Sequence, residues 1–308
     1  MTTSKDETLT ARAFVPGHVT GLFRIHDECD ELLQCGSTGA GFSVAIGTVT
    51  TVSVMEHSEL EITTDYNNER IDAQVTKTVV RRLANEFERK VRVHVSHDSS
   101  LVSGAGFGAS GAGALGTALA LSHIIDSEMP SEKAAQYAHC AEIINRTGLG
   151  DVFAQTIGGV EIRVKPGGPG VGKITPIPYD KSLRVILAGA PGLKTPDVLS
   201  SETYRTRINT IGDKLVDRII AKPTIRSLIQ CAREFSDAIG LKTERVESAL
   251  MDLDAAGFEE SSMVMLGDSV FCFCDEQETL EVEECLSRHW DPSQVLVSGI
   301  AETGGMLL

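Results

Sequence analysis

Residues 101–122 read Leu101-Val-Ser-Gly-Ala-Gly-Phe-Gly-Ala-Ser-Gly-Ala-Gly-Ala-Leu-Gly-Thr-Ala-Leu-Ala-Leu-Ser122. A loop of glycines and other small residues runs directly into a stretch rich in alanine and leucine, which predicts a helix. Because glycine lacks a Cβ atom, the main-chain N–H groups of such a loop can approach a ligand closely. The first turn of the helix adds unpaired N–H groups at the positive end of its dipole. The stretch therefore predicts a phosphate site, with a sterically close-packed helix entry as the alternative.

Two glycine patterns offer alternatives to this interpretation. Gly106-Phe-Gly108-Ala-Ser-Gly111 has the G-x-G-x-x-G spacing of dinucleotide-binding proteins, and Asp126 follows twenty residues after the first glycine. That motif needs a turn directly after a strand, whereas a polar stretch separates the expected strand Val91–Val95 from these glycines. Gly167–Lys173 resembles a P-loop without the hydroxyl residue after its lysine. We interpret it as a loop between two strands.

The length of 308 residues exceeds what a single hydrophobic core usually serves. We expect two domains, residues 1–178 and 179–308, because a polar break near Pro178 precedes a new apolar strand. Hydrophobic residues at 42% and charged residues at 23% are typical of a globular protein in water. No apolar run reaches the roughly 18 residues of a membrane span, and the N-terminus lacks the apolar segment of a secretion signal. These features predict a cytoplasmic protein without membrane contact.

The formal charge of −15 argues against a nucleic-acid partner, because phosphate backbones require basic patches. Any anionic ligand must then be held by local groups. The seven cysteines are odd in number and lack the spacing of metal ligands, so we expect reduced thiols.

Strands and helices alternate only partly along the chain, which favours an α+β fold. In the first half we expect a short strand in Ala13–Phe23 that bends into a binding loop, a small-residue loop at Gly36–Gly41, a strand at Val44–Val54 paired with Glu61–Thr64, helices over Ala73–Arg89 and from Ser131 to about Thr147, and strands at Val160–Lys165 and Lys173–Ile177. In the second half we expect a strand at Leu183–Ala188, helical structure over Asp213–Gly240 that is interrupted before Pro223, helices over Thr243–Ala256 and Glu276–His289, a hairpin with a two-residue turn at Gly267-Asp268, and a closing strand at Val295–Gly299.

If the glycine loop holds phosphates, phosphoryl transfer also needs a metal ion and a group that handles the acceptor hydroxyl. Mg²⁺ prefers hydroxyl, carboxylate and phosphate oxygens, so Ser110 in the loop and Glu142 on the next helix are candidate ligands. Asp151 follows Gly148-Leu-Gly150, a backbone that can project its carboxylate into a cleft. The alternatives are helix capping by Ser110 and Asp151 and a solvent-facing Glu142.

These motifs resemble those of the GHMP kinases, the superfamily of galactokinase, homoserine kinase and mevalonate kinase. Gly106–Ala112 resembles the second motif of the family, P-x-x-x-G-L-G-S-S-A, and Val15-Pro-Gly-His-Val19 resembles the first, with His18 in place of a basic residue. The resemblance implies a two-domain fold, with a ribosomal-S5-domain-2-like first domain and a ferredoxin-like second domain. The third, glycine-rich motif should fall near Gly257–Gly267, where the sequence departs from the family pattern.

Carried over by position, the resemblance implies that Asp151 is the catalytic aspartate and that Ser110 and Glu142 hold Mg²⁺. It implies nucleotide binding by Ser103, Gly104, Ala105, Gly106, Gly108, Ala109, Ser110 and Gly111. Phe14–Phe23, Gly36–Gly41 and Gly148–Val152 are most similar to the archaeal-type pantoate kinases, which phosphorylate pantoate with ATP on the route to coenzyme A. A carboxylate substrate suits a guanidinium, so Arg163 is the first candidate to bind it, followed by His18, Ser37 and Thr195.

The sequence therefore predicts an ATP- and Mg²⁺-dependent pantoate kinase. The alternatives are a kinase of another small alcohol, such as homoserine or mevalonate, and an inactive homologue that binds nucleotide. An NAD-binding oxidoreductase is a third, less favoured interpretation. The family resemblance also implies a homodimer.

Overall fold

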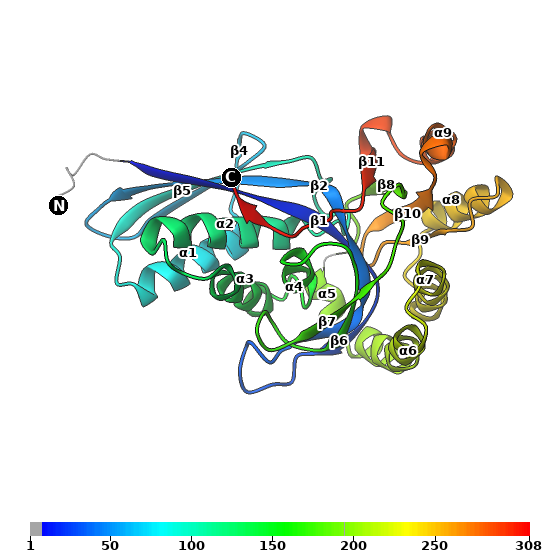
Figure 1. Cartoon of the computed structure of the whole chain (residues 1–308), viewed down its shortest axis with the longest axis horizontal. Coiled ribbons are helices and arrows are strands. Elements are labelled where there is room, and N and C mark those ends of the chain that lie inside the picture. The colour runs from blue at the N-terminus through cyan, green and yellow to red at the C-terminus, as the bar shows by residue number, and fades with distance from the viewer. Residues whose placement is uncertain (1–7, 194) are drawn as a thin grey trace.

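The computed structural model describes residues 8–193 and 195–308. Among these residues the strands form two sheets, one of eight strands and one of four (Figure 1). The large sheet comes from the first 177 residues and a short C-terminal strand, and the small sheet comes from residues 184–299. The predicted α+β class is confirmed. The division into domains at residue 178 stays a prediction.

The large sheet has the order β12-β1-β2-β5-β3-β4, with β6 paired to β2 and β7 paired to β6. Its strands are β1 (Leu9–His26), β2 (Gly36–Glu56), β3 (Glu61–Tyr66), β4 (Glu69–Arg70), β5 (Val91–Ser99), β6 (Val160–Lys165), β7 (Lys173–Ile177) and β12 (Met306–Leu307). β1 and β2 form a long antiparallel pair that extends from this sheet toward the second half of the chain (Figure 1).

Helices of the first half cover one face of the large sheet (Figure 1). They are α1 (Gln74–Glu86), α2 (Ala109–Ile125), α3 (Ser131–Asn145) and α4 (Asp151–Gln155). Every residue of α2 from Gly111 to Ser122 is buried, because the helix packs against β1 and β2 on one side and α1 and α3 on the other. A helix that is apolar all round requires such a buried position. The loop in front of α2 is thereby fixed to the core.

The small sheet has the antiparallel order β11-β8-β10-β9. Its strands are β8 (Arg184–Ala190), β9 (Ser261–Met263), β10 (Asp268–Cys274) and β11 (Val295–Gly299). Around it lie α5 (Thr195–Leu199), α6 (Glu202–Ala221), α7 (Ile225–Ile239), α8 (Glu244–Ala255), α9 (Thr279–Leu286) and the short 3-10 turns η1 (Glu276–Glu278) and η2 (Pro292–Gln294). α8 and α9 contact this sheet, α7 contacts both β9 and β1, and α6 packs against α7 and β1.

One apolar cluster joins the two sheets. Phe42 of β2 packs against Phe271 and Phe273 of β10, with ring centroids 5.1 and 4.8 Å apart. β11 of the small sheet also contacts β2, and the chain then returns to the large sheet, where β12 pairs with β1. In the described part of the chain, none of the helices has the length and apolar character needed to cross a bilayer.

The expected loop at Gly36–Gly41 is wrong, because these residues begin β2 and pair with the second half of β1. Likewise, the Pro16-Gly17 pair in β1 makes a register shift rather than the predicted bend. Local composition favours turns at both places. Pairing between distant residues satisfies their backbone groups instead, and such pairing overrides local preference.

Two smaller expectations about strand pairing are also corrected. Glu61–Thr64 lies in β3 as predicted, but it pairs in parallel with β5 and not with Val44–Val54. α1 carries the chain from one parallel strand to the next, as such a connection requires. The hairpin turn is longer than two residues, because β9 ends at Met263 and β10 begins at Asp268.

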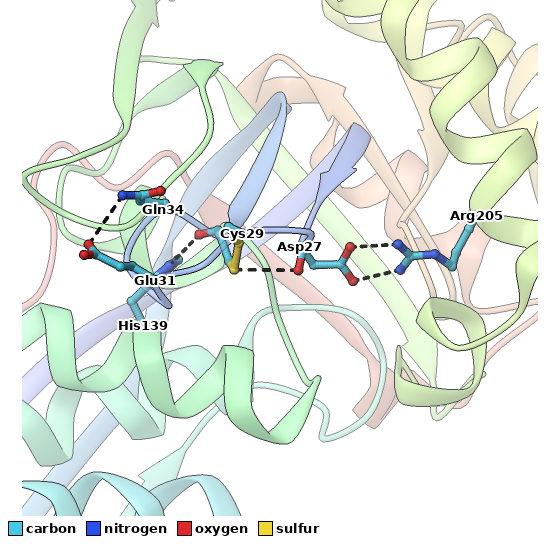
Figure 2. Close-up of a disulfide and its surroundings, with 7 residues drawn as sticks. Asp27, Cys29, Glu31, Gln34, His139 and Arg205 are labelled. Carbon is cyan, nitrogen blue, oxygen red and sulfur yellow. Dashed lines mark hydrogen bonds and ion pairs between the residues drawn. A yellow bond between two sulfur atoms is a disulfide. The ribbon is translucent and has the colours of Figure 1, made fainter.

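The expectation of reduced thiols is wrong for one pair, since Cys29 and Cys35 form a disulfide in the connection between β1 and β2 (Figure 2). The β1–β2 pairing brings their Cα atoms to 5.6 Å, a usual disulfide separation. Arg205 of α6 donates two hydrogen bonds to Asp27, and His139 Nε2 of α3 donates to the carbonyl of Cys35 at 2.9 Å (Figure 2). The connection is thus tied to both halves of the chain. The other five cysteines are free and buried.

Candidate active site

The glycine loop connects β5 to α2. Gly104, Gly106 and Gly108 have φ angles of 74°, 82° and 72°, in the left-handed region that glycine adopts without strain. Gly108 is the N-cap of α2 and offers no side-chain cap. The N–H groups in the first turn of α2 therefore have no intrahelical partner and are available to an anion.

Neighbouring segments hold this loop closely. A Cβ atom on Gly108 would lie 2.9 Å from the backbone nitrogen of His18, and one on Gly106 would lie 2.9 Å from the carbonyl oxygen of Met265. The backbone nitrogen of His18 also donates to the carbonyl of Phe107 at 3.0 Å. The loop is thus fixed between β1 and the β9–β10 connection.

The β9–β10 connection occupies the place where the glycine-rich third motif was expected. Met265 and Leu266 line the cavity described next, and Met265 N donates to the carbonyl of Thr20 at 3.2 Å. Leu266 adopts a φ of 72°, a conformation more usual for glycine. Apolar side chains therefore form this wall of the site.

A cavity of about 820 Å³ opens beside the glycine loop. Its lining brings together most of the residues that the sequence singled out: Ser37, Ser103, Gly104, Gly106, Gly108, Ala109, Ser110, Gly111, Glu142, Asp151, Arg163 and Thr195. Ala105 and His18 are completely buried and do not line it.

Ser110 in the first turn of α2 and Glu142 of α3 are in direct contact. Ser110 Oγ donates to Glu142 Oε1 at 2.5 Å, and Thr147 Oγ1 donates to the same oxygen at 3.0 Å. Glu142 is 2% exposed, and burial raises its pKa to about 7, against the opposing effect of these hydrogen bonds. The two side chains predicted as metal ligands therefore touch each other.

Asp151 is the first residue of α4 and lies between two donors. His18 Nδ1 is 2.7 Å from Asp151 Oδ1, and Thr20 Oγ1 donates to the same oxygen at 3.2 Å. Burial favours the protonated acid, but the hydrogen bond and charge of His18, the charge of Arg163 and the Thr20 hydroxyl outweigh it. Together they lower the pKa of Asp151. The carboxylate is thus ionised and oriented.

His18 lies behind Asp151, out of solvent. Its Nε2 is 3.1 Å from Glu161 Oε1, so each ring nitrogen faces a carboxylate. Burial alone would lower the pKa of His18, but the charges and hydrogen bonds of Glu161 and Asp151 raise it to about 9. At neutral pH the ring is therefore an imidazolium that donates to both acids.

Arg163 extends from β6 into the cavity wall although it is 1% exposed. One terminal nitrogen donates to Glu161 Oε1 at 2.5 Å and the other to Thr20 Oγ1 at 3.4 Å. Its Nε is buried without a partner in the structure. Ser37, on β2, lines the cavity near this guanidinium. Arg163 thus places a cationic side chain in the cavity wall, with its terminal nitrogens bound to Glu161 and Thr20.

Glycines in β2 provide the space for these two cationic side chains. A Cβ atom on Gly41 would lie 2.9 Å from His18 Nε2, and one on Gly39 would lie 3.1 Å from a terminal nitrogen of Arg163. The small residues of Gly36–Gly41 thus form part of a strand and leave room for neighbouring side chains, instead of forming the predicted loop.

The described residues contain no group of three or more His, Cys, Asp and Glu side chains that could hold a metal ion. The Ser110–Glu142 pair fits a different kind of site. Mg²⁺ commonly takes one or two protein oxygens and completes its shell with phosphate and water. The donor set is therefore compatible with a metal that arrives with a nucleotide.

Comparison with known proteins supports the motif assignment. The model of the GHMP kinase N-terminal domain matches residues 74–159. The chain is 34% identical over 281 residues to the pantoate kinase of Thermococcus kodakarensis, covering 90% of this chain and 91% of that protein. The chain belongs to the GHMP kinase family. Members of this family use ATP as phosphoryl donor, and the resemblance predicted from the sequence is confirmed.

Two further proteins are similar to this GHMP kinase over most of its length. The pantoate kinase of Methanocaldococcus jannaschii is 31% identical over 270 residues, covering 87% of this chain and 94% of that protein. A solved structure described as a phosphotransferase related to the CoA biosynthesis pathway has a TM-score of 0.86 and 30% identity, covering 97% of this chain and 99% of that one. The predicted GHMP kinase fold is confirmed.

Sequence reasoning missed Thr20 and Glu161 of this GHMP kinase. Glu161 and Arg163 are two residues apart on one strand, so they lie on the same face of β6. A glutamate and an arginine two residues apart in an otherwise apolar strand indicate a buried ion pair, and this pattern could have identified Glu161. Thr20 carried no comparable signal, because its role depends on the long β1–β2 pairing.

Proposed function

We propose that this chain transfers the terminal phosphoryl group of ATP to the primary hydroxyl of pantoate, forming 4-phosphopantoate and ADP on the route to coenzyme A. The single observation that carries the proposal is one cavity lined by the glycine loop, the Ser110–Glu142 pair, Asp151 and Arg163. Pantoate is proposed as the acceptor because the similar proteins are pantoate kinases.

The glycine loop and the first turn of α2 would hold the phosphates of ATP through backbone N–H groups. Ser110 and Glu142 would hold Mg²⁺, which supplies positive charge to the phosphates when bound. Loop residues 103–106, 108 and 109 would thus contribute mainly backbone, and the buried Ala105 would support the loop from behind.

Asp151 would orient the acceptor hydroxyl. The hydroxyl oxygen attacks the terminal phosphorus as the bond to ADP breaks, and the hydroxyl proton leaves to Asp151 or to solvent. Because the pKa of Asp151 is low, its charge and orientation contribute more than its basicity. His18 would act through Asp151 rather than by touching substrate, since it does not line the cavity.

Arg163 would bind the carboxylate of pantoate, assisted by Ser37 and Thr195. The guanidinium lies in the wall of the same cavity as Asp151, and its positive charge suits a carboxylate. It can therefore orient an acid whose hydroxyl faces Asp151. The homodimer and the cytoplasmic location stay predictions, and light scattering of the purified protein tests the first.

A panel of acceptors tests the function. ADP release is measured with ATP, Mg²⁺ and either pantoate, homoserine or mevalonate, and the product is identified by phosphorus NMR. We expect the highest kcat/KM for pantoate. Equal or better turnover of homoserine or mevalonate would overturn the acceptor assignment. ATP binding without turnover of any acceptor would indicate an inactive homologue.

A further inference from the structure

We propose that Glu161, which does not line the cavity, is a positioning residue that fixes the hydroxyl-orienting and carboxylate-binding groups relative to each other. This inference rests on the proposed function. Glu161 lies on β6 and is 1% exposed. Its Oε1 accepts from His18 Nε2 at 3.1 Å and from Arg163 at 2.5 Å.

Glu161 belongs to a closed ring of five side chains. From Glu161 the contacts run through His18 to Asp151, and through Arg163 to Thr20. Thr20 Oγ1 then donates to Asp151 Oδ1 and closes the ring. Asp151 and Arg163, which line the cavity, are therefore joined by two separate paths, one through Thr20 and one through Glu161.

The charges of the ring depend on Glu161. Two carboxylates face two cationic side chains, since the pKa of His18 is raised to about 9. Without the Glu161 charge, a buried cation would lack its compensation, which is strongly unfavourable. Arg163 and the His18 ring would then compete for Asp151, and both would leave their present positions.

The acceptor site depends on Glu161 at both of its ends. Glu161 supports Asp151 through His18 and supports Arg163 directly, so its removal should disturb both ends of the acceptor site. The glycine loop and the Ser110–Glu142 pair share no hydrogen bond with Glu161. Binding of ATP should therefore be left largely intact.

The variant Glu161→Gln tests the inference in the full-length protein. We expect kcat with pantoate to fall about 10- to 100-fold, the cost of a small misplacement of reacting groups. KM for pantoate should rise, whereas KM for ATP should stay near the wild-type value. The pantoate amide, which lacks the carboxylate, should show the kcat loss with a smaller change in KM.

Asp254→Asn is the matched control. Asp254 receives two hydrogen bonds from Arg233 at 2.8 and 2.6 Å, and neither residue lines the cavity. This substitution also removes the carboxylate partner of an arginine, so it should leave kcat and both KM values unchanged. Thermal unfolding and circular dichroism establish that each variant is folded.

Two further variants separate positioning from stability. Glu161→Asp keeps the charge on a side chain one methylene shorter, so it should recover part of the lost kcat, and it also serves if the Gln variant does not fold. In the background of His18→Asn, the loss of kcat from Glu161→Gln should shrink, because residues of one network are not additive. Full additivity would overturn the coupling.

Wild-type kcat and pantoate KM in a folded Glu161→Gln variant would overturn the positioning role while leaving the proposed function standing. An equal rise in the KM for ATP and for pantoate would also overturn it, since that pattern indicates a general disturbance. A wild-type protein that fails to phosphorylate pantoate defeats the proposed function instead.

Discussion

Asp151 obtains its ionised state from neighbours that the sequence separates widely. His18 and Thr20 come from β1, more than 130 positions away, and Arg163 comes from β6. The stretch Gly148-Leu-Gly150 was sufficient to predict the role of the aspartate that follows it, but not the residues that surround its carboxylate. Burial opposes ionisation, so the low pKa depends on the cation and hydroxyl that the β1–β2 pairing supplies.

Replacing Asp151 by Asn should abolish most of the turnover. The amide retains the shape of the carboxylate but neither its charge nor its capacity to accept a proton. We expect kcat to fall about 10²- to 10³-fold, as for loss of one preorganised electrostatic contact in an active site. ADP release measures the rate, and calorimetric titration with ATP should show binding nearly unchanged. The exposed Asp217→Asn is the control, and wild-type turnover in Asp151→Asn would contradict the assigned role.

The raised pKa of His18 predicts a pH-dependent stability. A group whose pKa is higher in the folded state than in the unfolded state contributes fully below its unfolded pKa of 6.5. That contribution is lost as pH rises through about 9. The difference in the free energy of unfolding between wild type and His18→Gln should therefore shrink from pH 6.5 toward pH 9. Urea denaturation at several pH values measures it, and a constant difference would contradict an imidazolium at this position.

Among the secondary-structure elements, those defined by local patterns were predicted well. Val160–Lys165, Lys173–Ile177 and Val295–Gly299 have the predicted bounds, because alternation and flanking turn residues define short strands. The glycine-rich start of β2 was missed. Its strand character comes from pairing with β1 and from the space that His18 and Arg163 need, and neither is encoded in neighbouring residues.

The left-handed backbone of the glycine loop should tolerate side chains poorly. Gly108→Ala and Gly240→Ala both place a side chain at a left-handed φ, 72° and 68°, which should cost about 1–2 kcal/mol each. At Gly108 the new Cβ would also crowd the His18 backbone, whereas at Gly240 its nearest neighbour is 3.5 Å away. Both variants should lose stability, but Gly108→Ala should also lose ATP affinity. Calorimetric titration with ATP measures this, and equal ATP affinity in the two variants would contradict phosphate binding by the loop.

For the whole molecule, composition and element order were sufficient to predict an α+β fold, and the motifs were sufficient to predict the family. The order of strands in the large sheet was not predictable, since β12 reaches β1 from the far end of the chain and β6 pairs with β2. The candidate site depends on the same pairings. Its motif residues were therefore predictable, whereas the ring through Glu161 was not.

The contact between the two sheets predicts that they unfold together. Phe271 is completely buried in β10 and packs against Phe42 of β2. Truncation in Phe271→Ala should lower the free energy of unfolding by about 3–5 kcal/mol, the usual cost of a cavity of this size. Because residues of both sheets contribute to the apolar cluster, the free energy of unfolding should fall by the same amount in both sheets.

Two local probes can measure this. The single tryptophan, Trp290, is buried and donates to the carbonyl of Asp268 in the small sheet, so its fluorescence reports unfolding there. Hydrogen exchange of β2 amides reports the large sheet. In the wild type and in Phe271→Ala we expect both probes to give the same free energy of unfolding. Separate transitions, with a loss confined to Trp290, would show instead that the halves of the chain are stable independently and that the shared cluster does not couple them.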